Sequence, residues 1–511
     1  MEKSITTQAL IYEAKKEENI NLELPVPEYL PGISKIINTS VLFSSCELHT
    51  ESTKAQLETN AHFDVLYLSD FGGKIKCASF DKQFSIPFKE PFEKDTDLTA
   101  VPSVHISALS AKPISSRKIL LKGTLYASCQ AYSDRETPIF VSDNDEEDIC
   151  VLEKKIVCCD TVIIQSSSMT ATAELNLEKD SPAANEVLLP KAAVHSPECV
   201  CNDGKLTVNA KLCLYALYEC LSDESSADSS ATYACVNSQT DFQCIVEDAR
   251  IKENCDCLAF IDINSIDCNC SYDSYGDSRI INYTISYTLC AKLFENKEYT
   301  VTQDVFSTAF PLQVENRKTS FNVSGESFSL TRTLTESLHG DLSSLSEISC
   351  CFAHIKTVST ENSSGKTFAN VKCLIEVIGI NSQGSISCVS LPASFHIPFD
   401  EKVNSYDSLE YFITVISCNA SLRDGSIDVS VDFDIKGIFK NSLITNAVCS
   451  ITKDIENPIS RAKGQLTVYY PSKDDTLWSV SKKYCVNPAV IRSSNGIDED
   501  TDTLDGIVII P

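Results

Sequence analysis

Three short segments at nearly equal intervals are the feature that most restricts how this chain can fold. Each begins with a cysteine seven residues before a phenylalanine, and the phenylalanines lie 158 and 153 residues apart. An apolar stretch precedes each segment: FDVLYL, LCLYAL and CLIEVI. About 150 residues is a usual size for one hydrophobic core. The spacing therefore predicts three diverged copies of one domain. The segments are CASFDKQFSIPF (Cys77, Phe84), CVNSQTDFQCIV (Cys235, Phe242) and CVSLPASFHIPF (Cys388, Phe395).

Within each copy, apolar and polar side chains alternate along the chain. The pattern is clear over residues 54–68, 205–219, 279–294 and 426–439, and the turn sequences DFGGK, LRDGS and SSGKT lie between such stretches. Alternation is typical of strands with one buried face, and turn formers between them are typical of antiparallel sheets. We therefore expect a mainly β protein, with the copies at residues 1–150, 151–312 and 313–456 and a separate module at 466–511.

The first copy contains the segments LELPVPEYLPGISKIINTSV, LETNAHFDVLYL, FSIPFKEP and SSRKILLKGTLYASCQAY in this order. In this order they resemble the SPOCS domain, a β-rich module of sporulation and spore-coat proteins in endospore-forming bacteria. The second and third copies resemble it less closely. The resemblance covers about 455 residues and implies three tandem antiparallel β-rich SPOCS-like domains.

Residues 466–511 predict a small strand, helix, helix, strand module. QLTVYY and GIVIIP have the pattern of short strands. Asp475 is the expected N-cap of the first helix and Asn487 that of the second, with Pro488 in the first helical position and Gly496 as the left-handed stop. The expected core side chains are Leu477, Trp478, Tyr484, Ile491 and Ile509.

This module resembles the lysin motif (LysM) domain in DTLWSVSKKYCV, the following NG and the final LDGIVIIP. The resemblance implies a groove between the loop that enters the first helix and the loop that leaves the second, where LysM domains bind N-acetylated glycans. Asp474 replaces the family's usual glycine and adds a negative charge there. The groove residues implied here are Lys473, Asp474, Asp475, Thr476, Leu477, Ser494, Asn495, Gly496 and Ile497.

The charge of the chain restricts its partners. With 71 acidic and 43 basic residues, the formal net charge is -28. Such a chain is repelled by phosphate backbones and by anionic lipids, so we expect no nucleic-acid partner. The first residues lack a secretory signal, and no apolar run is long enough to span a membrane, which predicts no membrane insertion and a location in the cytoplasm.

The 24 cysteines raise two alternatives. Cys255 and Cys257, with Cys268 and Cys270, could hold zinc, but one intervening residue is fewer than zinc sites use, and we favour two pairs facing each other across a hairpin. We therefore expect no metal there. The seven histidines are not clustered and no catalytic motif is present, so we also expect no cofactor and no enzymatic site. In Cys158–Cys159 and Cys350–Cys351, adjacent thiols point to opposite strand faces, so one of each pair is expected to be exposed and able to form cross-links.

Three SPOCS-like domains followed by one LysM-like domain resemble a family of sporulation morphogenetic proteins in anaerobic spore formers. The resemblance implies a non-enzymatic scaffold for spore coat assembly, made in the mother-cell cytoplasm and recruited to the forespore surface. It also implies a partner, the coat basement-layer ATPase known as stage IV sporulation protein A, gripped by the LysM domain. The alternative is a LysM domain that binds peptidoglycan or another N-acetylglucosamine polymer.

Overall fold

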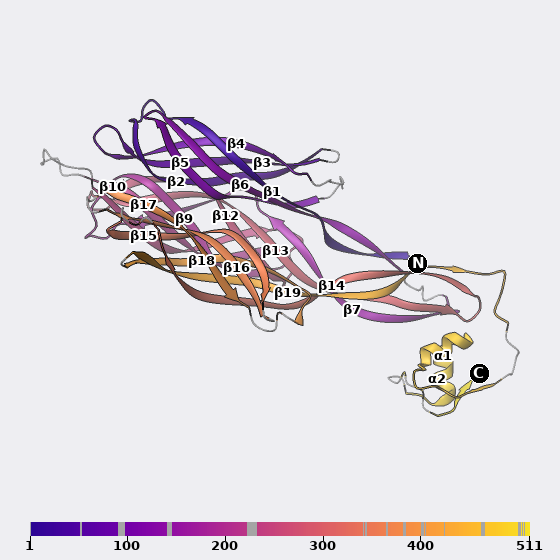
Figure 1. The fold of residues 1–511 in the computed structure, drawn as a ribbon. Helices are drawn as coiled ribbons and strands as arrows, with labels where there is room; N and C mark the ends of the chain where they lie inside the picture. Colours follow the sequence, from indigo (N-terminus) through magenta and orange to yellow (C-terminus); the bar gives the residue numbers. More distant parts are fainter. Residues whose placement is uncertain are drawn as a thin grey trace.

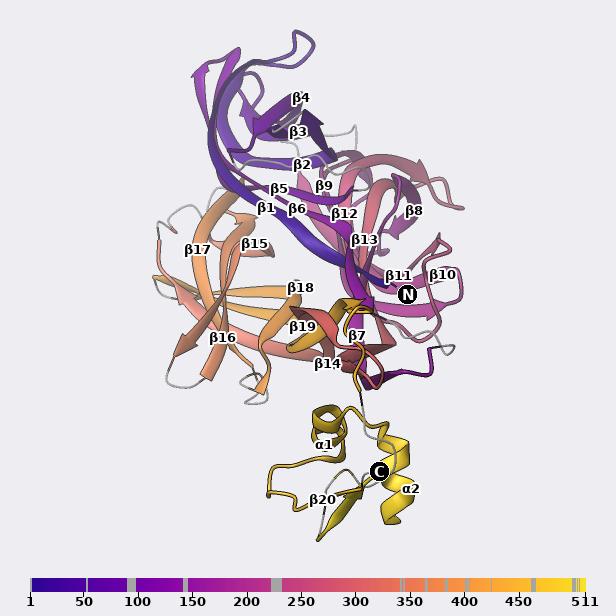
Figure 2. The same ribbon diagram turned by 90° about the vertical axis from the view of Figure 1, so that its right-hand side faces the viewer.

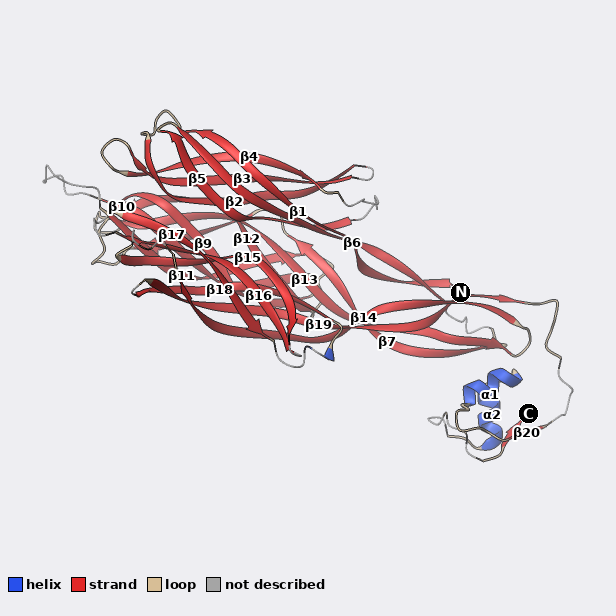
Figure 3. Ribbon diagram, viewed as in Figure 1, coloured by secondary structure: helices blue, strands red, loops and turns tan. Residues whose placement is uncertain are grey.

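The computed structural model describes residues 2–51, 54–89, 98–140, 146–221, 232–340, 342, 345–363, 366–381, 385–399, 403, 405–423, 425–460, 466–498, 502, 504 and 506–511. Strands make up most of this part of the chain, and both of its α-helices lie near the C-terminus (Figure 3). All pairings between the described strands are antiparallel. The predicted mainly β class is confirmed; the identity of the repeats as SPOCS domains stays a prediction.

The first set of strands forms two sheets, ordered β1-β6-β5 and β2-β3-β4. Buried side chains of both sheets, such as Phe63 on β3 and Leu121 on β6, share one core, so this set is a β-sandwich. We call it the first sandwich. Its strands are β1 (Glu2–Pro25), β2 (Ile33–Glu51), β3 (Lys54–Ser69), β4 (Ile75–Pro87), β5 (Leu98–Ser115) and β6 (Lys118–Phe140).

The second sandwich has the sheets β12-β13-β7 and β11-β10-β9. The strand β7 pairs with the C-terminal half of the long strand β13, and β8 pairs with its N-terminal half. Leu214 and Tyr283 lie in the core between its two sheets. Its strands are β7 (Ile149–Gln165), β8 (Met169–Asn176), β9 (Ala184–Asn202), β10 (Lys205–Cys220), β11 (Tyr233–Glu247), β12 (Asp256–Tyr272) and β13 (Ser278–Ser307).

The third sandwich repeats this arrangement with the sheets β14-β19-β18 and β15-β16-β17. Ile375 and Phe433 lie in its core. Figure 2 shows the three sandwiches grouped around a common centre. The strands of the third are β14 (Leu312–Leu338), β15 (Glu347–Ser363), β16 (Lys366–Ile380), β17 (Ile386–Pro398), β18 (Ser408–Arg423) and β19 (Ser426–Lys453).

The repeated cysteines found in the sequence occupy one equivalent position in the three sandwiches. Each lies opposite a large aliphatic residue of the neighbouring strand, and all six side chains belong to one apolar cluster where the sandwiches meet. The alternating pattern buries one face of a strand in its own sandwich, and at these positions a neighbouring sandwich covers the other face. The pairs are Cys77 with Leu66, Cys235 with Leu217, and Cys388 with Ile378.

A buried tyrosine follows this aliphatic residue in the first two sandwiches. The Tyr67 hydroxyl donates to the carbonyl of Pro31 at 2.9 Å, and the Tyr218 hydroxyl donates to the carbonyl of Pro182 at 3.1 Å. The third sandwich has Gly379 in this place, where a Cβ atom would lie only 2.0 Å from the carbonyl oxygen of Glu347. The third copy has therefore lost this anchor.

Three pairs of strands continue beyond the sandwiches and form a stalk, visible on the right of Figure 1. The pairs are β1 with β6, β7 with β13, and β14 with β19. All three pairs contribute side chains to the apolar clusters of the stalk. The stalk is thus a shared structure and not three independent ribbons. Its buried residues are Ile139, Phe140, Ile149, Ile156, Cys158, Val301, Val305, Phe321, Ala447 and Val448.

Two carboxylates link the three sandwiches, the buried Glu376 and the half-buried Glu410. Glu376, which is 6% exposed, accepts hydrogen bonds from Asn38 of the first sandwich at 2.7 Å and from Lys191 of the second at 2.5 Å. Glu410 accepts from Lys292 of the second sandwich at 2.5 Å, and the same lysine donates to Tyr132 of the first at 3.1 Å. Since a buried charge is stable only when it is paired, these contacts fix the sandwiches relative to one another.

The C-terminal module, residues 466–511, has the predicted order of strand, helix, helix and strand. Strands β20 and β21 pair with each other, and the two helices contribute Val480 and Ile491 to a small core. The elements are β20 (Thr467–Tyr469), α1 (Leu477–Tyr484), α2 (Pro488–Asn495) and β21 (Val508–Ile510).

Candidate functional site

The candidate site is the C-terminal module, and the start of α1 shapes its first loop. Thr476, not Asp475 as predicted, is the N-cap: its hydroxyl accepts from the Ser479 amide at 3.1 Å, and the Ser479 hydroxyl accepts from the Thr476 amide at 3.0 Å. The two residues thus form a reciprocal capping box. The Asp475 carboxylate accepts instead from the Ser472 amide and the Tyr469 hydroxyl, both at 2.7 Å, and the bond from Ser472 is the main cause that lowers its pKa.

The second loop follows α2, whose predicted ends are confirmed. Asn487 caps the helix and accepts from the Ala489 amide at 2.9 Å, Pro488 opens it, and Gly496 ends it with a φ of 63°. Asn495 joins α2 to β21: its side chain donates to the carbonyl of Ile509 and accepts from the amide of Ile509, both at 2.7 Å. Both polar ends of this amide are therefore occupied within the module.

The core of the module differs from the predicted set in two places. Leu477 and Ile491 are buried and Tyr484 packs against them, as predicted, whereas Ile509 is 41% exposed. In the short strand β21 the residues on either side, Val508 and Ile510, point inward, so the predicted face was wrong by one residue. Trp478 lies outside this core and contacts the stalk.

The nine predicted groove residues divide by exposure. Leu477 is 1% exposed and Ile497 packs partly against the same core, so these two residues of the two loops share a cluster. Asp475 and Asn495 are half-buried and engaged as described, and the Ser494 hydroxyl donates to the carbonyl of Val490 at 2.8 Å. Four predicted residues besides Ser494 are exposed: Lys473, Asp474, Thr476 and Gly496.

A contact between the module and the stalk joins residues 174 positions apart in the chain. The Trp478 indole donates to Asp304 Oδ2 at 2.9 Å, and Lys482 Nζ lies 2.5 Å from Asp304 Oδ1. The Trp478 ring also meets Phe306 edge-on, with the ring centroids 5.0 Å apart. Partial burial alone would raise the pKa of Asp304, but the bonds from Lys482 and Trp478 outweigh it and lower the pKa. Asp304 and Phe306 had no sequence signal, because their role depends on a distant segment.

An apolar patch lies on the strand side of the module. Val468 and Ile509 are directly opposite each other on β20 and β21, and both are exposed, by 56% and 41%. Leu466, Tyr470 and Ile507 beside them are exposed as well. We call these five residues the strand patch.

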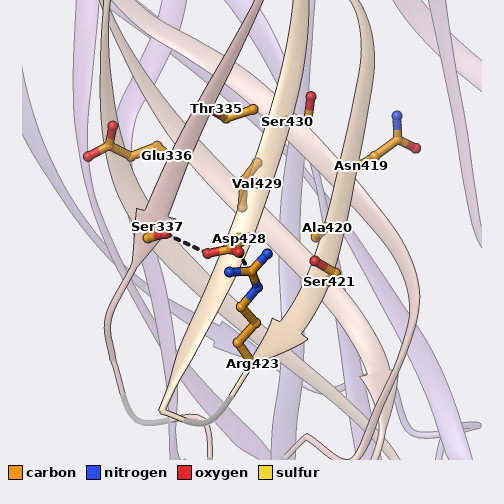
Figure 4. Close-up of a pocket in the computed structure, with 10 residues that line it drawn as sticks. All are labelled: Thr335, Glu336, Ser337, Asn419, Ala420, Ser421, Arg423, Asp428, Val429 and Ser430. Carbon is orange, nitrogen blue, oxygen red and sulfur yellow. Dashed lines mark hydrogen bonds and ion pairs between the residues drawn. The ribbon is translucent and has the colours of Figure 1, made fainter.

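Two shallow depressions lie on the sandwiches, each about 400 Å³ in volume. Figure 4 shows the first, where Asp428 bonds to Ser337 and pairs with Arg423. The second lies around Ser110 and Lys122 on the first sandwich. The positions correspond, since Ser110 faces Lys122 as Asn419 faces Ser430 in the third. A depression that recurs with different side chains reflects the twist of the sheet rather than the chemistry of one ligand.

The four cysteines considered for zinc do not come together. Cys257, Cys268 and Cys270 lie on the single strand β12, and Cys255 directly precedes it, so the predicted hairpin between the pairs is also wrong. Cys257 and Cys268 are eleven residue steps apart along an extended chain, about 36 Å at 3.3 Å per step. In the described part of the chain, no group of three or more histidine, cysteine or acidic side chains has the arrangement of a metal site.

The expected exposure of adjacent cysteines is also wrong. Cys158 and Cys159 are 1% and 5% exposed, because the stalk core covers one and Leu258, Phe294 and Ile438 cover the other. The thiol of Cys350 is hydrogen-bonded to that of Cys235 in the second sandwich, and the thiol of Cys351 is hydrogen-bonded to that of Cys418. Contacts between sheets and between sandwiches bury Cys158 and Cys159 and leave Cys350 and Cys351 half-buried, so neither pair has a fully exposed thiol.

Comparison with known proteins gives no relative: no family model, no curated protein and no solved structure matches this chain. Among the residues that the structure describes, no helix is both long and apolar enough to cross a membrane.

Proposed function

We propose that this protein is a non-enzymatic scaffold for spore coat assembly, and that its C-terminal module binds the coat basement-layer ATPase, stage IV sporulation protein A. It would act in the mother-cell cytoplasm and at the forespore surface. The proposal starts from the resemblance of the module to LysM domains and of the repeats to SPOCS domains. The observation that supports it further is that polar side chains in the two loops of the module already form hydrogen bonds within the module.

A glycan-binding groove needs free short polar groups that can bond to N-acetyl groups. In this module such groups already bond internally: Thr476 caps α1, Asp475 bonds to Tyr469 and Ser472, and Asn495 bonds to β21. Lys473 and Asp474 remain exposed and charged. Exposed charges at the rim of an interface steer association between proteins and select the partner. This favours a protein partner over the alternative, an N-acetylglucosamine polymer.

The rest of the molecule suits a scaffold. Three sandwiches linked by buried charge pairs and by a shared stalk form a rigid support, and the module lies beside the end of that stalk (Figure 1). Because this support is already ordered, no entropy is lost in ordering it when a partner binds the module.

Binding measurements with the full chain test this proposal. We expect saturable binding of the purified ATPase, weakened at least tenfold by Asp474→Lys, because the substitution reverses a charge at the exposed loop. Asp180→Lys, a charge reversal at an exposed position of the second sandwich, is the matched control and should bind like the wild type. Saturable binding of chitin oligomers or muropeptides without binding of the ATPase would instead establish the glycan alternative.

A further inference from the structure

The sulfur atoms of Cys351 and Cys418 lie 3.1 Å apart. Cys351 lies on β15 and Cys418 on β18. Each of these strands is the outer strand of its sheet in the third sandwich, and the two strands lie against each other where the sheets meet. The thiol pair therefore bridges two different sheets at the edge of one sandwich.

The surroundings hold both cysteines in place. Cys351 lies opposite Val377 of the neighbouring strand β16, and Cys418 lies opposite Val431 of the neighbouring strand β19. Both valines are fully buried. A second contact joins the same two strands: the hydroxyls of Thr360 and Tyr411 lie 2.9 Å apart. Because the edge is fixed at two points, the sulfur atoms stay close to each other. A disulfide bond needs about 2.05 Å between sulfurs, so closure requires a movement of about 1 Å by two side chains.

We propose that Cys351 and Cys418 form a disulfide bond that joins β15 to β18 at this edge of the third sandwich. The oxidant is a low-molecular-weight disulfide. The thiolate of one cysteine attacks a sulfur of this compound, and a mixed disulfide forms as the first small thiol leaves. The second cysteine then attacks the cysteine sulfur of the mixed disulfide and releases the second small thiol. The two protein protons end on the two small thiols, and two electrons pass to the oxidant.

The hydrogen bond to Cys418 and burial raise the pKa of Cys351, so the first attack falls to Cys418 and Cys351 closes the ring. The two residues are half-buried and not fully enclosed, so a small disulfide can reach one of them. Once the mixed disulfide has formed, the second thiol is already within 3.1 Å, which makes ring closure faster than attack by a thiol from solution. The proposal is independent of which partner the C-terminal module binds.

The second sandwich has a comparable arrangement at the corresponding edge. There, the thiol of Cys257 on β12 is hydrogen-bonded to the thiols of Cys199 and Cys201 on β9. β9 and β12 are again the outer strands of the two sheets. Because thiols face each other across the same edge in two sandwiches, the contact between Cys351 and Cys418 is a repeated feature of the fold and not a chance one.

The test is oxidation of the full-length reduced protein with oxidised glutathione, followed by alkylation, proteolysis and mass spectrometry. We expect a linked pair of peptides containing Cys351 and Cys418, and a higher Tm than that of the reduced protein, because the bond restricts the unfolded chain. Cys418→Ser should lose both effects, and Cys351→Ser provides the same test if the first variant does not fold. Cys485→Ser, in the C-terminal module, should keep both.

Two results would overturn the proposal. One is stable glutathione adducts on Cys351 or Cys418 without the linked peptides. The other is a linked pair whose formation leaves the Tm unchanged or lower, since the bond would then not stabilise the sandwich.

Discussion

His62 on β3 lies between two carboxylates, with Nε2 3.3 Å from Asp64 and Nδ1 2.7 Å from Asp81. The hydrogen bond to Asp64 is the main cause that raises the pKa of His62 to about 9. The register places Asp64, Tyr215 and Glu376 at one equivalent position in the three sandwiches. All three are polar and bonded, but to different partners, so the repeats have kept a polar position and changed its chemistry.

An NMR titration of the full chain should give a midpoint near pH 9 for His62. The raised pKa means that the charged ring stabilises the fold fully below about pH 6.5, and that this contribution is lost as the pH rises through about 9. Asp64→Asn should move the midpoint down toward 6.5, whereas Asp241→Asn, at the exposed Lys211 pair, should leave it in place. A wild-type midpoint near 6.5 would contradict the pairing.

At the scale of elements, helix α1 uses one face for the core of its module and another for strand β13. Leu477 and Val480 point into the core, and Trp478 and Lys482 contact Asp304. Both partners of the Lys482–Asp304 pair are partly exposed, with side-chain exposures of 45% and 30%. Such pairs are weak and are screened by salt. The module is therefore held on the stalk by a contact that can open.

The only tryptophan of the chain reports on this contact. Asp304→Asn should shift Trp478 fluorescence to longer wavelength and increase its quenching by acrylamide, because the lost charge releases the indole to water. Raising the salt concentration should move the wild type in the same direction. Asp180→Asn, in the second sandwich, serves as the control. Equal quenching of wild type and Asp304→Asn at low salt would argue against docking.

The sequence predicted individual strands much better than their environment. The alternating stretches 54–68, 205–219, 279–294 and 426–439 all lie within strands, since period-two alternation follows directly from strand geometry. Strand β13 continues to Ser307, well beyond its alternating stretch, because its end is buried by other strands of the stalk.

At the candidate site, too, the sequence predicted features that depend on neighbouring residues and missed those that depend on distant segments. The cap at Asn487 and the stop at Gly496 were predictable because they depend on neighbours in the sequence. Asp475 and Thr476 are both residue types that cap helices, with Asp the slightly better, and only the reciprocal bonds of Thr476 with Ser479 decide for Thr476. The place of Trp478 depends on Asp304, which no local pattern indicates. Leu477 is buried, so substitution there tests folding of the module rather than its binding surface.

At the scale of the whole molecule, Glu376 is the point where all three sandwiches meet. Burial alone would raise its pKa, but the charge of Lys191 is the largest opposing cause, and the pKa is held well below its ordinary value. His354 adds a contact of 3.2 Å to Oε2. Such a carboxylate stabilises the arrangement only while it is ionised and paired.

Glu376→Gln should lower the free energy of unfolding at pH 7 by about 3 kcal/mol, because it leaves Lys191 partly buried without its countercharge. Since the folded-state pKa is depressed, the wild-type advantage is present above the unfolded pKa of about 4.3 and is lost as the pH falls toward the folded value. Chemical denaturation across this pH range measures it. Glu361→Gln, at an exposed site of the same sandwich, should cost little; an equal loss in both variants would remove the special role of Glu376.

The shared stalk also sets the order in which the chain can fold during synthesis. Ile139, near the end of the first sandwich, is covered by Val301 from the second and by Phe321 and Ala447 from the third. Each sandwich can close once its own strands have left the ribosome, but these apolar ends stay uncovered until nearly 450 residues have been made. A ribosome that stalls while it translates the third sandwich would therefore release a chain with two folded sandwiches and exposed apolar strand ends. Chaperones bind species of this kind.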